Sequence, residues 1–501
     1  MLTRPAKASG AGLLIYLGWM LVIGTTGAHA DWPQWRGPER NGYIDSVALV
    51  EQLPSDGIKP EWTIKDFDGG TSGGWSSPVI SDGKVYLYAH TKTKNPDLDP
   101  GEAKYPWIAP DKRGGMTDQE YEEYEVKRRD ENERRAKAFR FDERLLCVDL
   151  ESGETVWDRS LECVYTRFTQ SSTPCVANGR VFVLGPKRTA RCYEASTGEV
   201  VWEQQLPGEF RDEFFASSFL VAGDVALVSC GPLTALSAND GTILWQGDTS
   251  TNYQSHSSPA IWSPGDSQHP EHVVFANTSG GKTKAYRLSD GHKLWQLNSG
   301  TGQSTPIVAG NLLLTYGSSR KSGLTAYQLD PAAPERQPDA IWQFQRAADS
   351  GSTPVVCRDA VFVQGEKRLA KVDLASGDTV WQTTLKISNP RYTSLVAAGD
   401  QVFYGWEGLL AFAAEPDRFT AFYDAEVDSK GRLIGADDLR EELKISELSS
   451  EDDGLAKAEK LWKREAISSG PLACSSPAID AGRIVLRLKK GIVCYDLRAQ
   501  K

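Results

Sequence analysis

One acidic stretch of the sequence has the residue types and the spacing of a calcium-binding loop. It is EVDSKGRLIGAD (426–437), in which the oxygen-ligand positions of that pattern are taken by Glu426, Asp428 and Asp437. Lys430 stands where a further oxygen ligand belongs, and its positive charge opposes a bound cation. The sequence therefore favours a surface turn that leads into a helix, and leaves these three carboxylates as the alternative metal site.

No catalytic motif accompanies that loop. The sequence contains no GxSxG, HExxH or P-loop pattern. His269 and His272 are spaced like metal ligands, but no cysteine or carboxylate set stands beside them. We therefore assign no catalytic residues and interpret the two histidines as loop residues.

The elements that would position a site are set by a repeat that ends in tryptophan. A phrase such as VDLESGETVW, which ends at Trp157, recurs along the chain, and its glycine supplies the positive φ that a hairpin turn needs. The tryptophans assigned to this position are Trp62, Trp157, Trp202, Trp245, Trp295, Trp342, Trp381 and Trp462. Those from Trp157 to Trp381 lie roughly 39 to 50 residues apart, which is the period of a four-stranded propeller blade.

Each repeat opens with a pair of small hydroxyl residues, usually followed by proline, and continues as short alternating strands. The last copy supplies only three strands, ending at 493–497, whereas PEWTIKDF (60–67) is a tryptophan strand with no blade before it. Joining the two completes an eighth blade and removes the open edges of a linear array. The sequence thus predicts an all-β fold, an eight-bladed β-propeller of four-stranded antiparallel blades that is closed by pairing the N- and C-terminal strands.

The repeat also predicts the state of several cysteines. Cys147, Cys192 and Cys494 occupy the same strand position in three blades, where other blades carry apolar or small residues. This pattern favours buried, unpaired thiols. The alternative is a bridge such as Cys175 to Cys192 within one blade, because an exported protein can form disulfides.

Propeller geometry places the residue before each hydroxyl pair at one mouth of the central channel. Together with two neighbours, the polar and aromatic residues of this ring form a collar of Trp75, Gln170, His256, Gln303, Arg391 and Tyr392. Such a collar would suit a peptide, a sugar or an aromatic ligand. The alternative is that these loops only close the mouth.

The N-terminal region departs from the repeat. Residues 1–30 have a basic start, an apolar stretch and an Ala28-His29-Ala30 cleavage pattern, which predicts a secretory signal peptide. We expect an N-terminal arm over 31–59 and the propeller over 60–501.

Two insertions interrupt the propeller, a charged helical one at about 90–143 and an acidic one at about 413–461. In the first, Thr117 and Glu120 form a capping box for a helix over 117–139. This helix carries few apolar residues, so we expect a solvated arm, with a partner-binding projection as the alternative.

The repeated xDxxTGxxxW phrase resembles the pyrroloquinoline-quinone-type repeat over nearly all of residues 60–497. DWPQWRGP (31–38) is similar to the mature N-terminus of secreted, planctomycete-type members of that family. The resemblance implies that the tryptophan of each blade docks against the next blade. It leaves two kinds of function open, since the same ring serves quinone-dependent dehydrogenases and non-catalytic scaffolds. Those dehydrogenases have an adjacent cysteine pair, and no two cysteines are adjacent here.

We therefore expect an exported, monomeric binding scaffold, periplasmic or extracellular, similar in type to the propeller component of the outer-membrane barrel-assembly machinery. It would have no membrane span after signal cleavage and no cofactor, and would bind an envelope protein, a peptide or a carbohydrate. The net charge of −11 argues against a nucleic-acid partner. The alternatives are a quinoprotein dehydrogenase of alcohols or sugars, which would bind PQQ with calcium, and a carbohydrate-binding propeller.

Overall fold

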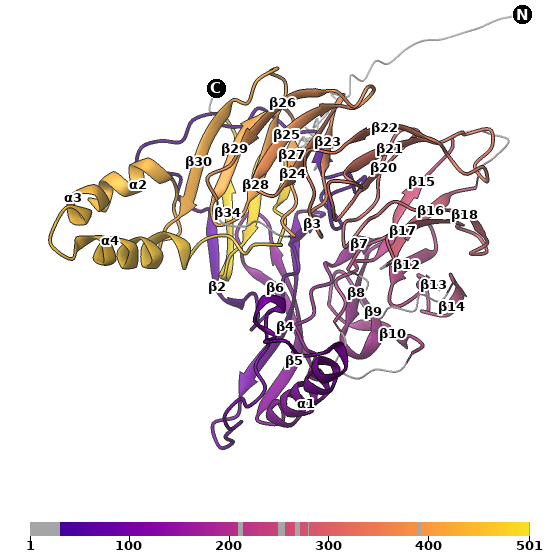
Figure 1. Cartoon of the computed structure of the whole chain (residues 1–501), viewed down its shortest axis with the longest axis horizontal. Coiled ribbons are helices and arrows are strands. Elements are labelled where there is room, and N and C mark those ends of the chain that lie inside the picture. Colours follow the sequence, from indigo (N-terminus) through magenta and orange to yellow (C-terminus); the bar gives the residue numbers. More distant parts are fainter. Residues whose placement is uncertain are drawn as a thin grey trace, which may run out of the picture.

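The protein is a ring of eight β-sheets, each built around four antiparallel strands (Figure 1). The computed structural model describes residues 31–208, 214–248, 256–265, 271–278, 280–387 and 392–499. The predicted signal peptide, His269 and Arg391 lie outside these ranges. The predicted eight-bladed propeller is confirmed.

The blades follow one another along the chain. The first four are β3 (Val79–Ser81), β4 (Lys84–Lys94), β5 (Phe139–Asp149) and β6 (Thr155–Glu162); β7 (Cys175–Ala177), β8 (Arg180–Gly185), β9 (Thr189–Glu194) and β10 (Val200–Gln205); β11 (Leu220–Ala222), β12 (Val225–Ser229), β13 (Leu233–Ser237) and β14 (Ile243–Gln246); and β15 (Ala260–Trp262), β16 (Val273–Thr278), β17 (Lys282–Arg287) and β18 (Lys293–Leu297). The next three are β19 (Ile307–Ala309), β20 (Leu312–Tyr316), β21 (Leu324–Gln328) and β22 (Ala340–Phe344); β23 (Val355–Cys357), β24 (Ala360–Gly365), β25 (Arg368–Asp373) and β26 (Thr379–Thr384); and β27 (Val396–Ala398), β28 (Gln401–Gly405), β29 (Leu409–Ala413) and β30 (Ala421–Val427).

Both ends of the chain build the eighth blade. Its inner strands are β32 (Ala478–Asp480), β33 (Arg483–Arg487) and β34 (Lys490–Asp496), and its outer strand is β2 (Trp62–Asp68). Trp62 lies opposite Cys494 in this antiparallel pair. The first strands of neighbouring blades contact each other, for example β3 with β7 and β3 with β32, so these strands surround the central channel. The predicted closure by the two termini is confirmed.

Seven of the eight assigned tryptophans join neighbouring blades. The indole Nε1 of Trp157 donates to Ala195 O at 2.9 Å, and that of Trp202 donates to Ala238 O at 3.0 Å. The equivalent bonds of the other blades run from Trp62, Trp245, Trp295, Trp342 and Trp381 to Leu150, Leu288, Pro334, Leu374 and Pro416. A Cβ on Gly241 would lie 2.6 Å from the Trp202 ring, so the glycine of each phrase makes room for the tryptophan of the preceding blade.

Trp462 is not part of this series, and its assignment was wrong. It is the last residue of helix α4 (Gly454–Trp462), where the Arg440 guanidinium lies 4.2 Å from its ring centroid. Tyr423 of β30 takes the tryptophan position of the seventh blade, opposite Ala411, as Trp245 stands opposite Ala235. The seventh blade thus uses a different aromatic residue, and its outer strand lies within the stretch that we expected to be inserted.

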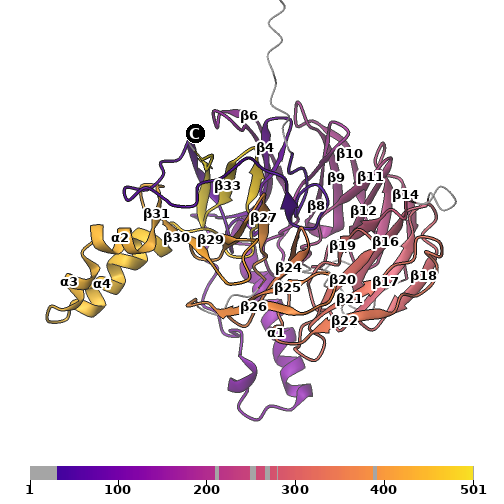
Figure 2. The same ribbon diagram turned by 90° about the horizontal axis from the view of Figure 1, so that it is seen from above.

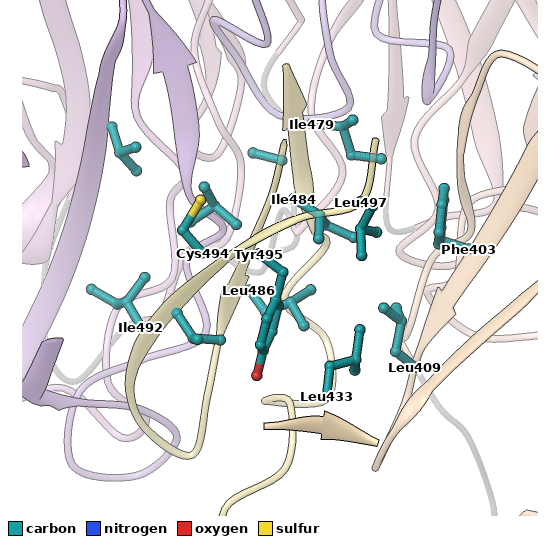
Figure 3. Close-up of a cluster of buried hydrophobic side chains, with 14 of the residues drawn as sticks. Phe403, Leu409, Leu433, Ile479, Ile484, Leu486, Ile492, Cys494, Tyr495 and Leu497 are labelled. Atoms are coloured by element: carbon teal, nitrogen blue, oxygen red, sulfur yellow. The ribbon is translucent and has the colours of Figure 1, made fainter. Parts of the chain in front are cut away.

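Apolar side chains fill the spaces between blades. Figure 3 shows the cluster between the seventh and eighth blades, where Phe403, Leu409 and Leu433 face residues of β33 and β34. These residues are almost inaccessible to solvent because alternate positions of each strand point into the neighbouring sheet. Cys494 belongs to this cluster as an unpaired thiol.

The other cysteines of the predicted set follow the same pattern. Cys147 and Cys192 are unpaired and buried in their blades. Cys175 is also unpaired, which overturns the alternative bridge to Cys192. The prediction of buried thiols is confirmed for these residues.

Two helical insertions project from the ring (Figures 1 and 2). Helix α1 (Asp118–Ala136) extends the hairpin of β4 and β5, and the predicted capping box between Thr117 and Glu120 is present. The second insertion contains β31 (Leu433–Gly435), α2 (Ala436–Glu442), α3 (Ile445–Ser449) and α4, and follows β30. Within the described part of the chain, no helix combines the length and apolar character that crossing a membrane requires.

Candidate binding site at the channel mouth

The second residue of each hydroxyl pair forms a hydrogen-bonded belt around the channel. Thr173 Oγ1 accepts the N–H of Ser77 at 3.0 Å, and Ser218 Oγ accepts the N–H of Thr173 at 2.9 Å. Five further bonds of this kind continue the belt through Ser258, Thr305, Thr353, Ser394 and Ser476. The hydroxyl pairs thus connect neighbouring blades, a role that their spacing in the sequence did not reveal.

The residues before these pairs lie where loops of neighbouring blades meet. The N–H of Trp75 donates to Ser171 Oγ at 3.1 Å, and that of Gln303 donates to Ser350 O at 2.6 Å. Tyr392 is 42% exposed and lies so close to Gly351 that a Cβ there would be 2.0 Å from its ring. These contacts join neighbouring loops of the predicted collar.

Two phenylalanine rings form a row with His256 of the collar. The ring centroids of Phe168 and Phe214 are 5.7 Å apart, and those of Phe214 and His256 are 4.9 Å apart. Phe168 is 51% exposed, so one end of this row faces solvent. Burial lowers the pKa of His256 to about 4, which keeps the imidazole neutral at pH 7. Its Nδ1 has no hydrogen-bond partner among the described residues. Neither phenylalanine was predicted, because neither directly precedes a hydroxyl pair.

Gln170 connects this row to the first blade. Its backbone N–H donates to His90 Nδ1 at 2.9 Å, and its Oε1 accepts the N–H of Phe215 at 3.2 Å. The side chain is fully buried, and in the described part of the chain its Nε2 has no hydrogen-bond partner. A buried amide donor without an acceptor is costly, typically by about 1–3 kcal/mol. The site therefore contains an unused donor at Gln170 and an unused ring nitrogen at His256.

Asp349 shapes the opposite part of the collar. Its Oδ1 accepts the N–H groups of Gly351 at 2.8 Å, Ser352 at 2.7 Å and Tyr392 at 3.4 Å. This carboxylate holds the loop that carries Tyr392, whose φ of 63° lies in the left-handed region. An Asp three residues before a serine is a common turn signal, but its link to Tyr392 is visible only in the structure.

Comparisons with known proteins agree with this fold. Residues 142–337 and 330–418 match the family model described as "Outer membrane protein assembly factor BamB". The chain belongs to this family. The outer membrane protein assembly factor BamB of Shewanella oneidensis is 27% identical over 272 residues, which cover 50% of this chain and 65% of that protein.

Solved structures show the same ring in other proteins. A quinohemoprotein alcohol dehydrogenase from Comamonas testosteroni aligns with a TM-score of 0.54 and 11% identity, covering 94% of this chain and 81% of that one. A europium-containing methanol dehydrogenase aligns with a TM-score of 0.51 and 11% identity, covering 79% of this chain and 85% of that one. At this identity the likeness concerns the fold alone.

The acidic loop is built differently from a calcium site in this BamB-family chain. Asp428 Oδ1 accepts the N–H groups of Lys430 at 2.9 Å and Arg432 at 2.8 Å, and its Oδ2 pairs with Arg432 Nε at 2.8 Å. Asp437 is exposed at the start of α2. Burial, reinforced by the charge of Asp424, raises the pKa of Glu426 to about 7. Among the described residues no group of three or more His, Cys, Asp or Glu side chains could hold a metal ion.

Proposed function

We propose that this protein is an exported, non-catalytic scaffold that holds a peptide segment of an envelope protein at the channel mouth. The observation that carries the proposal is the row of Phe168, Phe214 and His256 beside the buried amide of Gln170. An apolar or aromatic side chain of the partner would pack on the exposed face of Phe168. A backbone group of the same segment would reach the unused nitrogen of His256.

The family gives the expected class of partner. The Shewanella relative is described as an outer membrane protein assembly factor, and this chain spans 65% of its length. We infer that the partner of this chain is also a protein of the cell envelope. The predicted signal peptide supports a periplasmic or extracellular location.

The geometry at the mouth gives little support to a quinone and calcium. A planar quinone needs two parallel rings or walls, but the Phe168 and Phe214 planes make an angle of 67°, and those of Phe214 and His256 make 58°. Asp349, a carboxylate in the described loop before β23, already accepts three N–H groups through Oδ1. These residues do not fit the cofactor, so we propose a role without it.

Site-specific photocrosslinking tests the proposal. A photoreactive phenylalanine analogue is placed at Phe168 in the full chain expressed in its own host, with Leu244 as the control position because it is 49% exposed on an outer strand. We expect one envelope protein to be crosslinked from position 168 and not from position 244, and the Trp75→Ala variant to weaken that crosslink. Equal crosslinking from both positions, or a protein recovered only in the cytoplasmic fraction, would refute the proposal.

A further inference from the structure

The N-terminal segment of the described chain, residues 31–44, runs along the inner strands of the ring, in the middle of the molecule (Figures 1 and 2). Trp32 O accepts the N–H of Ile80 in β3 at 2.9 Å, and Pro33 O accepts the N–H of Val176 in β7 at 2.7 Å. Farther along, β1 (Tyr43–Ile44) pairs in parallel with β27 of the seventh blade. The segment therefore crosses from the first two blades to the seventh.

Two arginines of this segment bind backbone carbonyls around the channel. Arg36 is fully buried, and its Nη1 donates to Leu395 O at 3.1 Å and to Thr353 O at 3.3 Å. Arg40 is 3% exposed, and its Nη1 donates to Phe219 O at 2.7 Å. The two guanidinium groups thus attach the segment to the third, sixth and seventh blades.

Both arginines keep their charge in this environment. Burial lowers the pKa of Arg36 to about 9 and that of Arg40 to about 10, so both remain protonated at pH 7. The hydrogen bonds of both guanidinium groups go mainly to main-chain carbonyl oxygens of the ring. A guanidinium has five N–H donors and suits several acceptors at once, which a lysine could not satisfy.

The segment is also shaped to fit. Gly37 has a φ of 77°, and a Cβ there would lie 3.0 Å from the Trp32 ring. Gly42 has a φ of 87°, and a Cβ there would lie 2.4 Å from Arg36 Nη2. Both glycines let the segment turn tightly around its own buried side chains, Trp32 and Arg36.

The segment lies at the end of the channel opposite the collar. Asp31 accepts the Ser81 hydroxyl at 3.0 Å and the N–H of Asp82 at 3.2 Å, in the turn that follows β3. Trp75 of the collar precedes β3. Because the turn and Trp75 lie at opposite ends of the same inner strand, the segment and the collar face opposite mouths.

We propose that the inner rim of the ring is a peptide-recognition site and that residues 31–44 are its ligand, an internal plug that closes this mouth of the channel. The site buries the side chain of Trp32 in an apolar cluster and binds two guanidinium groups through ring carbonyls. The channel is then a blind pocket, entered only from the mouth that carries Trp75 and His256. This proposal is independent of which partner, if any, binds at that mouth.

The first test separates the plug from the ring after folding. A protease recognition sequence is inserted between Val47 and Ala48, which are both exposed, and the full chain is purified, cut and passed over a gel-filtration column. We expect the N-terminal fragment to co-elute with the ring and the fragment of the Arg36→Ala, Arg40→Ala variant to separate. Arg287→Ala, at a surface ion pair, is the matched control. Because the bonds of residues 48–50 stay on the ring side of the cut, equal retention of native and variant fragments would refute the proposal.

The second test uses the uncut chain and a native thiol. Cys175 is 2% exposed, and its Sγ lies 3.9 Å from Gln34 Oε1 beneath the plug. In the Arg36→Ala variant we expect thiol labelling of Cys175 to accelerate about tenfold to a hundredfold, the range set by losing a hydrogen-bonded charged group. Cys192, in the same blade, should label at its native rate. Unchanged labelling of Cys175, or equal acceleration of both thiols, would show that residues 31–44 are not a separable ligand.

Discussion

Replacing Thr173 by valine tests whether the hydroxyl belt stabilises the ring. Thr173 Oγ1 is the acceptor for the N–H of Ser77, and Thr173 is 2% exposed. Valine has nearly the same shape but offers no acceptor, so the Ser77 N–H would be left buried without a partner. Such a group costs about 1–3 kcal/mol, which corresponds to a roughly fivefold to hundredfold larger population of the locally open state.

Hydrogen exchange measured by mass spectrometry on a peptide that contains Ser77 reads this opening directly. A melting temperature would be a poor readout, since in a chain of this size about 1 kcal/mol shifts it by only about a degree. Thr155→Val, at an exposed position of β6, is the matched control and should leave exchange at Ser77 unchanged. If Thr173→Val also leaves it unchanged, this bond of the belt makes no net contribution to stability.

Two further predictions concern the blades. Gly241→Ala places a Cβ 2.6 Å from the Trp202 ring at a φ of 76°, so we expect the free energy of unfolding in urea to fall by about 2–4 kcal/mol. The control Gly223→Ala, with a φ of 57° and open space around its Cβ, should lower it by only about 1 kcal/mol. Equal losses would contradict the docking role of the glycine. Glu426 has a folded pKa of about 7, above its unfolded value, so the folded state binds the extra proton and stability falls as pH rises from about 4.5 to 7. Glu426→Gln should therefore stabilise the protein by roughly 3 kcal/mol at pH 8 and have little effect at pH 4, and an equal effect at both values would refute the shift.

The ring was predictable from the sequence because its determinants are local and repeated. A glycine with positive φ and the tryptophan after it occur in each phrase, and the structure shows why: Gly241 faces Trp202 of the preceding blade. The prediction failed at Trp462 because only tryptophans were considered for the docking position. Trp462 lies about 81 residues after Trp381, whereas Tyr423 lies about 42 residues after it, within the period of the repeat. Tyr423 follows β29 directly and stands opposite Ala411, so the spacing favoured a tyrosine at this position.

The candidate site was less predictable. The collar was placed by propeller geometry, and contacts of Trp75, Gln303 and Tyr392 with neighbouring loops lie where that geometry puts them. Phe168 and Phe214 were missed because they lie in loops between blades, where no repeat phrase marks them. A loop residue that belongs to no repeated position carries little signal in a single sequence.

The buried arginines show a more general limit. Arg36, Arg40 and Arg487 are all nearly inaccessible, and each donates to main-chain carbonyls, as Arg487 does to Ser76 O at 2.8 Å and Tyr88 O at 2.9 Å. Bonds of this kind cannot be predicted by a search for complementary side chains, because every residue has a carbonyl and its type is irrelevant. A propeller, however, collects the strand starts of many blades around one channel and leaves some of their carbonyls pointing inward. In such a ring an arginine can connect blades that are hundreds of residues apart, so a basic residue in an otherwise unassigned arm is itself a reason to expect that the arm enters the channel.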